Sequence, residues 1–105
     1  MKKKNWGRIV NISSIWGKIS KEGRAAYSAS KFALDGLTIG LAAEYSGYGI
    51  MANCIAPGFV DTSLTRSMLS SDQIKDLITQ VPVGRLGQVD EISHLVHMVK
   101  PICTK

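Results

Sequence analysis

The apolar residues in the first half of the chain follow two different periods. GRIVNISS, residues 7–14, contains a short β-branched apolar run that is typical of a buried strand. From about Arg24 to Tyr45 the apolar positions recur at helical spacing, and the glycines within residues 46–49 are suited to end that helix. IMANCIAPG, residues 50–58, is a second apolar run that ends in proline and glycine. Strand, helix and strand in this order predict a βαβ unit with parallel strands, and therefore an α/β fold.

Shorter elements are predicted in the second half. FVDTSLTRSML, residues 59–69, is polar and irregular, and it is interpreted as either a loop or a short helix. Ser70 or Ser71 can cap a helix that runs through residues 72–78. VDEISHLVHMV, residues 89–99, has the pattern of another amphipathic helix.

Composition indicates an ordinary globular domain. Pro101 prevents the last helix from continuing, and no linker or repeat divides the chain, so residues 1–105 are expected to form a single domain. The hydrophobic fraction of 45% and the charged fraction of 20% are typical of soluble proteins. No apolar run approaches the ~20 residues that span a bilayer, and the basic start has no signal-peptide core. We expect a cytoplasmic protein with no membrane partner.

Charge and metal-ligating residues narrow the function classes. The net charge of +5 suits an anionic partner such as a nucleotide, but no stripe of aromatic and basic residues supports nucleic-acid binding. Cys54 and Cys103 have neither zinc-site spacing nor a disulfide framework. His94 and His97 are three residues apart on a predicted helix, but no third ligand is evident, so we expect no metal site. Trp16 is interpreted as either a pocket wall or a packing residue.

The candidate chemistry lies at YSASK, residues 27–31. Tyr27 and Lys31 are four residues apart, so they project from the same side of a helix. A nearby ammonium favours the phenolate form of a tyrosine and so prepares the phenol to give or take a proton. Ser14 ends the first predicted strand, and the carboxyl ends of strands are where open α/β sheets bind ligands. Its hydroxyl is suited to bind a substrate oxygen.

The long predicted helix carries many small residues. Its apolar positions share one broad face: Ala26, Ala29, Ala33, Leu37, Gly40 and Leu41. Each glycine inside a helix costs roughly 1 kcal/mol relative to alanine, so these residues indicate close approach by a neighbouring backbone. That neighbour is either the sheet alone or a partner's helix as well.

Four segments follow one another along the chain in a characteristic order and spacing: NISS, YSASK, NCIAPGFVDT and QVPVGRLG. The arrangement resembles the short-chain dehydrogenase/reductase family in its compact form, over residues 7–99. The closest likeness is to the 3-oxoacyl-acyl-carrier-protein reductase group and its sugar- and polyol-oxidising relatives. The resemblance implies a partial Rossmann-like, doubly wound parallel sheet. It further implies hydride transfer between NAD or NADP and a small carbonyl or alcohol substrate, in a homodimer or homotetramer.

The resemblance implies a role for each matching proton-handling residue. Tyr27 would be the general acid or base. Lys31 would hold the nicotinamide ribose, which Tyr27 also contacts. Ser14 would orient the substrate oxygen, with Ser13 as the competing candidate.

It also implies a coenzyme-binding loop after the second strand. Pro57 and Gly58 would shape the loop beside the nicotinamide. The Val60 backbone and the Thr62 side chain would contact the carboxamide.

The resemblance covers only part of the family's pattern. The sequence shows no glycine-rich turn that could receive the pyrophosphate of the coenzyme. Gly47-Tyr48-Gly49 does not replace it, because these residues follow a helix and precede a strand, which is the reverse of the required order. We therefore expect a chain that lacks the amino-terminal nucleotide-binding half and the carboxyl-terminal end, as a fragment or a truncated gene product. By itself it is expected to be inactive and to bind coenzyme weakly or not at all. The alternative is a non-catalytic remnant or an interaction module that associates through the small-residue helix. A serine hydrolase using Ser14 would need a G-x-S-x-G motif, which the chain lacks.

Overall fold

The computed structural model describes residues 1–99, and the molecule measures 51 × 29 × 23 Å. The predictions that concern Pro101 and Cys103 lie outside these residues. In chain order the elements are η1 (Lys2–Lys4), β1 (Gly7–Ile12), η2 (Ile15–Gly17), α1 (Ala25–Tyr45), η3 (Ser46–Tyr48), β2 (Ile50–Ile55), α2 (Ser63–Met68), α3 (Ser71–Thr79) and α4 (Val89–Val99). None of the helices within this part of the chain is both long enough and apolar enough to cross a lipid bilayer.

The two strands form a parallel pair, as the order of elements predicts. Gly7 lies opposite Ile50, and the register continues to Ile12 opposite Ile55. The N–H of Ser13 extends the pairing by donating to the Ile55 carbonyl at 2.7 Å. Within residues 1–99 each strand pairs on one side only, so each leaves an open edge.

The hydrophobic core is small, because a two-stranded sheet covers little apolar surface. Within the described residues, the buried hydrophobic side chains are Ile50, Ile55 and Leu86. The first strand was predicted to be buried, but it is mostly half-buried, and Ile12 is 44% exposed. The missing burial reflects the open sheet edges, and it predicts marginal stability for the chain alone.

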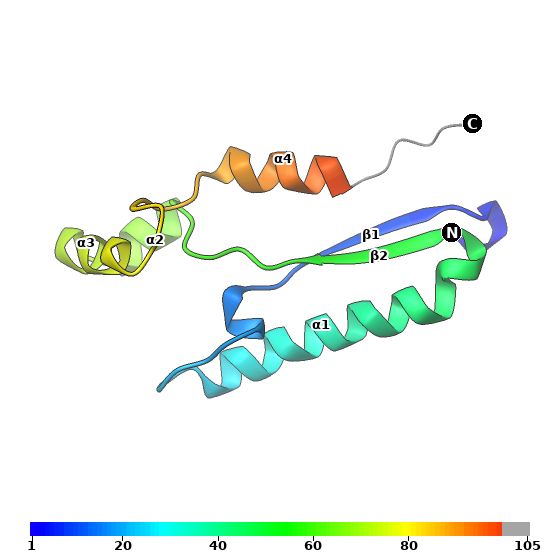
Figure 1. Cartoon of the computed structure of the whole chain (residues 1–105), viewed down its shortest axis with the longest axis horizontal. Coiled ribbons are helices and arrows are strands. Elements are labelled where there is room, and N and C mark those ends of the chain that lie inside the picture. The colour runs from blue at the N-terminus through cyan, green and yellow to red at the C-terminus, as the bar shows by residue number, and fades with distance from the viewer. Residues whose placement is uncertain (100–105) are drawn as a thin grey trace.

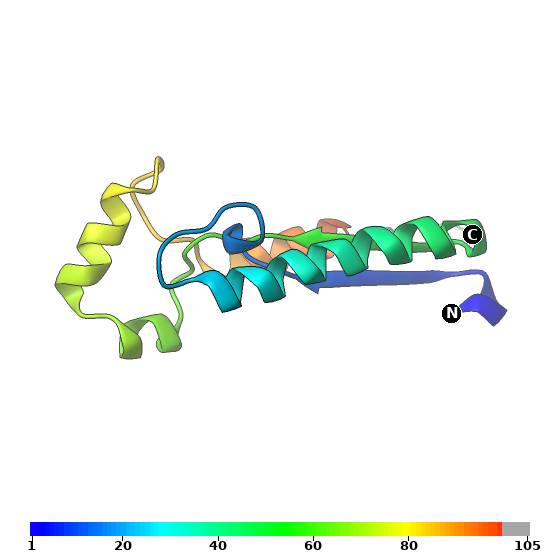
Figure 2. The same cartoon turned by 90° about the horizontal axis from the view of Figure 1, so that it is seen from below.

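The helices lie in separate places around the strand pair. α1 runs along one side of the strands and α4 lies on the other side (Figure 1). α2 and α3 lie beyond the ends of the strands, away from the turn that joins α1 to β2 (Figures 1 and 2). The carboxyl ends of both strands therefore point toward the region of α2 and α3.

The face of α1 that meets the strands is polar. Its buried residues are Ser28, Asp35 and Thr38. Thr38 accepts a hydrogen bond from the Asn11 side chain at 2.8 Å, and Asp35 accepts one from the Cys54 thiol at 3.0 Å. The helix is therefore attached to β1 and β2 by side-chain hydrogen bonds rather than by an apolar stripe.

Four of the small residues of α1 face away from the sheet. Ala29, Ala33, Gly36 and Gly40 are exposed, and a Cβ added at either glycine would meet no atom within 4 Å. The interpretation that these residues pack against the sheet is therefore wrong for this chain. The hydrogen bonds of Asp35 and Thr38 turn their side of the helix toward the strands, and the helical period then leaves these four small residues on the other side.

Two predicted helix ends have identifiable caps. Ser70, rather than Ser71, caps α3, and it forms a reciprocal capping box with Gln73. The region 59–69, which was interpreted as loop or short helix, contains both: α2 follows an extended loop. Gly49 has a φ of 66°, and a Cβ there would collide with the Asn5 carbonyl oxygen, so glycine is required at this turn.

An ion pair between Arg85 and Glu91 holds the loop before α4. Arg85 donates two hydrogen bonds to the Glu91 carboxylate, at 2.7 and 2.8 Å, and the Gln88 N–H donates a third at 2.8 Å. The hydrogen bonds from Arg85 and then from Gln88 lower the pKa of Glu91 from 4.5 to about 2. Because the folded form has the lower pKa, the stabilisation is present above pH 4.5 and is lost as the pH falls toward 2.

We predict that Glu91→Gln reduces the loss of stability between pH 5 and pH 2. The side chains of Arg85 and Glu91 are both about half exposed, so the effect on stability will be modest and will shrink at 1 M salt. Urea unfolding followed by circular dichroism at several pH values measures it. Asp90→Asn is the matched control, since it removes a carboxylate from the same helical turn without breaking the Arg85 pair. An equal change in both variants would contradict this prediction.

Candidate active site

A pocket of about 380 Å³ lies where the two strands end. It is lined by Ser14, Trp16, Arg24, Tyr27, Gly58, Phe59, Val60, Thr62, Leu64, Thr65, Met68 and Leu69. These residues come from the segment after β1, the start of α1, the loop after β2, and α2 with its flanks. The location matches the carboxyl end of a parallel sheet, where such folds bind ligands.

Ser14 and Ser13 have different positions relative to this pocket. Ser14 lines it, and its hydroxyl oxygen accepts a hydrogen bond from the Trp16 N–H at 3.2 Å, so its own proton remains available. Ser13 is not part of the lining, and its hydroxyl donates to the Lys31 carbonyl at 3.2 Å. Of the two serines, Ser14 therefore has the hydroxyl that meets the pocket.

Tyr27 stands in the first turn of α1 and also lines the pocket. Its side chain is 45% exposed. The Nζ of Lys31 lies 5.6 Å from the centre of the Tyr27 ring and donates to the Ile12 carbonyl at 3.2 Å. The helical spacing thus brings phenol and ammonium to the same end of β1, with Lys31 beside the pocket rather than in its lining.

The loop after β2 forms the next wall. Gly58, Val60 and Thr62 line the pocket, whereas Pro57 lies outside the lining and its carbonyl accepts from the Ile15 N–H at 3.0 Å. Val60 forms a parallel bridge with Gly87, which joins this loop to the segment before α4. The loop is therefore held at both ends.

Thr62 has a structural role that its sequence context does not indicate. Its hydroxyl oxygen caps α2 by accepting from the Thr65 N–H at 3.1 Å. Thr65 in turn donates to the Val60 carbonyl at 2.9 Å. Because the Thr65 hydroxyl donates to Val60, the Thr62 hydroxyl is left to donate to Thr65 Oγ1, 3.0 Å away.

The sequence predicted a role for only some of the residues that line the pocket. Trp16 and Phe59 meet edge to face, with ring centres 6.3 Å apart at 70°. Trp16 was interpreted as either a pocket wall or a packing residue, and it is both. Arg24, Leu64 and Met68 were missed, although the three-residue spacing from Arg24 to Tyr27 was a readable signal.

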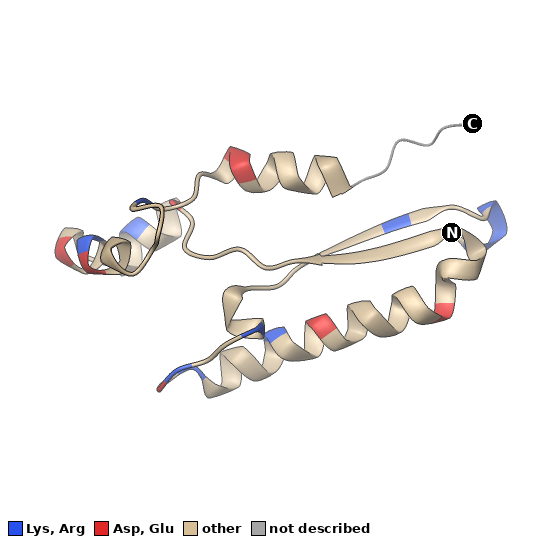
Figure 3. Cartoon of the chain, viewed as in Figure 1, with Lys and Arg blue, Asp and Glu red and all other residues tan. Residues whose placement is uncertain are grey.

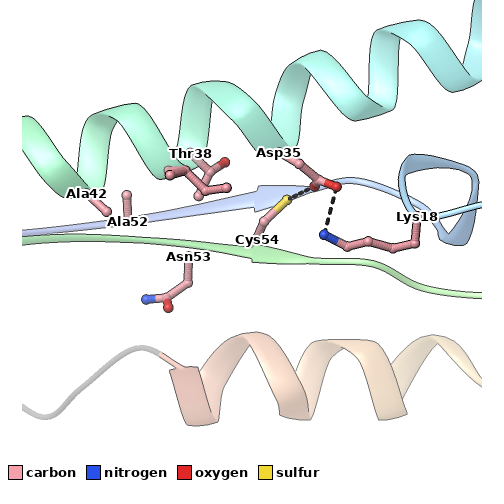
Figure 4. Close-up of a pocket in the computed structure, with 8 residues that line it drawn as sticks. Lys18, Asp35, Thr38, Ala42, Ala52, Asn53 and Cys54 are labelled. Atoms are coloured by element: carbon pink, nitrogen blue, oxygen red, sulfur yellow. Dashed lines mark hydrogen bonds and ion pairs between the residues drawn. The ribbon is translucent and has the colours of Figure 1, made fainter.

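A second hollow, of about 260 Å³, lies between α1 and β2 (Figure 4). Asp35 is 2.9 Å from the Lys18 ammonium and accepts a hydrogen bond from the Cys54 thiol. The bond from Cys54, followed by that from Lys18, lowers the pKa of Asp35, and burial raises the pKa of Cys54. Cys54 is thus kept as a thiol, and the group joins the loop after η2 to α1 and β2.

The candidate metal ligands are dispersed. Within residues 1–99, no three His, Cys, Asp or Glu side chains gather closely enough to hold a metal ion. His94 and His97 are both exposed on α4.

Comparison with known proteins identifies the family. The family model for short-chain dehydrogenases matches residues 1–80, which is most of the chain. The chain belongs to the short-chain dehydrogenase family. This finding agrees with the α/β fold and with the resemblance drawn from the four sequence segments.

Similar curated proteins include reductases of acyl thioesters. The chain is 45% identical over 96 residues to a 3-oxoacyl-[acyl-carrier-protein] reductase of Pseudomonas aeruginosa, and the matched stretch covers 91% of this chain and 38% of that protein. It is 44% identical over 96 residues to an acetoacetyl-CoA reductase of Shinella zoogloeoides, which covers 91% and 40%. The chain therefore spans about two fifths of the length of these relatives.

Solved structures show the same fold. A gluconate 5-dehydrogenase from Burkholderia cenocepacia, in complex with NADP and tartrate, superimposes with a TM-score of 0.86 and 34% identity, over 93% of this chain and 39% of that one. The Y152F form of ElxO with NADPH bound gives a TM-score of 0.90 and 28% identity, over 99% and 43%. The βαβ unit and its flanking helices are thus part of a Rossmann-type dehydrogenase fold.

Proposed function

We propose that this chain is the catalytic segment of an NAD- or NADP-dependent oxidoreductase that interconverts a carbonyl compound and a secondary alcohol. The observation that carries the proposal is that Ser14 and Tyr27 line one pocket at the carboxyl ends of parallel strands, with Lys31 beside Tyr27. Membership of the short-chain dehydrogenase family and the NADP or NADPH in solved relatives support it.

In the reducing direction, Ser14 donates its hydroxyl proton in a hydrogen bond to the substrate carbonyl oxygen. Tyr27 then gives its phenolic proton to that oxygen, which becomes the alcohol. Lys31 provides an ammonium beside the phenol and a donor for the ribose hydroxyls of the coenzyme. In the oxidising direction the phenolate accepts the same proton. The bound nicotinamide supplies or accepts the hydride.

The loop after β2 is suited to lie against the nicotinamide. A Cβ added at Gly58 would meet only the Ile15 side chain at 3.8 Å, so the pocket side of this glycine is open to a flat ring. The Val60 backbone and Thr62 stand farther along the same wall, where a carboxamide would lie. A pocket of about 380 Å³ accommodates a nicotinamide and a small substrate, but not the whole dinucleotide.

The proposal is tested in a chimeric reductase. In this chimera the present chain replaces the 96-residue stretch that it matches in the Pseudomonas aeruginosa reductase. The reduction of methyl acetoacetate with NADPH or NADH is measured by the decrease in the absorbance of the reduced nicotinamide. We expect turnover that depends on Tyr27. A folded chimera that reduces no carbonyl compound would overturn the proposal.

We also propose that the exposed small-residue face of α1 is a contact between two copies of the chain. Ala29, Ala33, Gly36 and Gly40 leave room for close helix approach, and Phe32 beside them is 49% exposed. A two-fold contact would place this face against itself. The same contact is the basis of the alternative function, a non-catalytic interaction module.

We predict that Ala33→Leu and Gly36→Leu shift the chain toward monomer in sedimentation velocity. The space above Gly36 is open within one chain, and leucine favours helix over glycine by up to ~1 kcal/mol, so the monomer should not lose stability. Ser93→Leu, at an exposed position of α4, is the control and should leave the oligomer unchanged. If all three variants sediment like the parent, this face is not the interface.

A further inference from the structure

Arg24 shares the pocket with the two hydroxyls that handle the substrate oxygen. It is the last residue before α1 and lies three positions before Tyr27. Its guanidinium carbon lies 6.0 Å from the centre of the Trp16 ring, over one wall of the pocket. Side chains three apart at the start of a helix are neighbours, with Cβ atoms about 5–6 Å apart. Arg24, Ser14 and Tyr27 line one pocket, so a ligand in this pocket can meet all three side chains.

The charge of Arg24 is unpaired in the described residues. The ion pairs within residues 1–99 are Lys18–Asp35, Arg66–Asp61 and Arg85–Glu91. Both arginines of the second half therefore hold a carboxylate, whereas Arg24 holds none among the described residues. Asp76 lines a neighbouring hollow together with Arg24, but it is not within ion-pair distance.

Arg24 has both basic and acidic neighbours along the chain, because Lys21 and Glu22 precede it on the same loop. Lys21 also lies near Trp16, with its Nζ 5.4 Å from the ring centre. Figure 3 shows basic positions on the loop that leads into α1. Among residues 1–99 the Arg24 guanidinium makes no side-chain hydrogen bond, and an arginine fork that lines a pocket is suited to bind a carboxylate through two parallel hydrogen bonds.

Part of the pocket lining is apolar. Leu64, Met68 and Leu69 form this part, and Leu64 and Met68 are 65% and 72% exposed. A ligand that fits would therefore carry an anionic group at Arg24, a carbonyl or hydroxyl at Ser14 and Tyr27, and a short carbon chain against the apolar wall.

We propose that Arg24 binds the carboxylate of the substrate, so that the enzyme acts on small oxo acids and the corresponding hydroxy acids. This inference rests on the proposed function, because it uses the same pocket. Because Arg24 and Tyr27 line the same pocket of about 380 Å³, this pocket suits acids whose carboxylate is separated from the carbonyl by one or a few bonds, such as 3-oxo acids.

The kinetic test compares acetoacetate with its methyl ester in the chimeric reductase. The two compounds have the same reacting carbonyl and differ in charge. We expect acetoacetate to have the higher kcat/KM in the parent. Arg24→Met should lower kcat/KM for acetoacetate by about tenfold or more, mainly through KM, and leave the ester nearly unchanged.

Lys21→Met is the matched control. It removes a positive charge from the same tryptophan, but Lys21 does not line the pocket. Its effect on acetoacetate should stay below about twofold, which separates a specific carboxylate contact from a general loss of positive potential. Equal effects of the two variants, or a parent without preference for the acid, would overturn the inference.

A binding test does not require turnover. Acetoacetate and methyl acetoacetate are titrated into the isotope-labelled 105-residue chain without coenzyme, and the amide and arginine side-chain resonances are followed by NMR. Shifts that are caused by the acid, and that Arg24→Met but not Lys21→Met abolishes, support the inference. No shift with the parent would count against it. If the chimera reduces neither compound, the proposed function has failed. In that case the NMR titration alone tests whether Arg24 binds the carboxylate.

Discussion

Replacing Tyr27 with phenylalanine is expected to lower kcat of the chimeric reductase by ~10²–10⁴-fold, because a positioned proton donor typically contributes that factor. The substitution removes one oxygen and keeps the ring. In residues 1–99 the Tyr27 hydroxyl makes no hydrogen bond to the protein, so the fold should be nearly unchanged. Lys31 and the loop after β2 keep their proposed contacts with the coenzyme, so its affinity should also change little. Steady-state rates with methyl acetoacetate and a separate titration of NADPH measure the two quantities.

Tyr48→Phe is the control for this substitution. Tyr48 belongs to η3, at the opposite end of α1, and its ring is 42% exposed. Removing its hydroxyl should leave the rate unchanged. A Tyr27→Phe enzyme that works within a factor of two of its parent, with chemistry limiting the rate, would exclude Tyr27 as the proton donor.

The 105-residue chain by itself is expected to bind NADPH and NADH with dissociation constants above the micromolar range and to reduce no ketone. Coenzyme affinity in this fold class depends on a glycine turn and a helix amino terminus that receive the pyrophosphate. In residues 1–99, β1 leads into η2 and β2 leads into the Pro57-Gly58 loop, and neither is a glycine-rich strand-to-helix turn. The contacts near Lys31, Val60 and Thr62 would have to hold the coenzyme alone.

The small core adds to this expected loss. A buried core of Ile50, Ile55 and Leu86 holds the site less rigidly than a complete sheet would, and a displacement of ~1 Å can cost ~10²-fold in rate. Isothermal titration calorimetry with both coenzymes measures the affinity, and the Pseudomonas aeruginosa reductase is the positive control. Micromolar binding together with turnover of a ketone would show that the chain rebuilds the missing contacts.

The sequence by itself was sufficient for the local elements. The strands and the helix from Ala25 to Tyr45 follow from apolar period and glycine placement, which act within a few positions along the chain. Capping residues likewise predicted the start of α3, although only the structure shows that Ser70 rather than Ser71 is the cap. The pairing of Tyr27 with Lys31 followed in the same way, because residues four apart share one side of a helix. The parallel strands followed from element order.

Only the tertiary structure decided how these elements face one another. Polar Asp35 and Thr38 meet the sheet while the small residues of α1 face outward, because hydrogen bonds to Cys54 and Asn11 are made across the fold and leave no local signal. The same reason applies in the pocket. Whether Ser14 or Ser13 meets Tyr27, and that Arg24 joins them, depends on how the strand end, the helix start and the loop after β2 come together. Such contacts join residues far apart in the chain, and periodicity does not encode them.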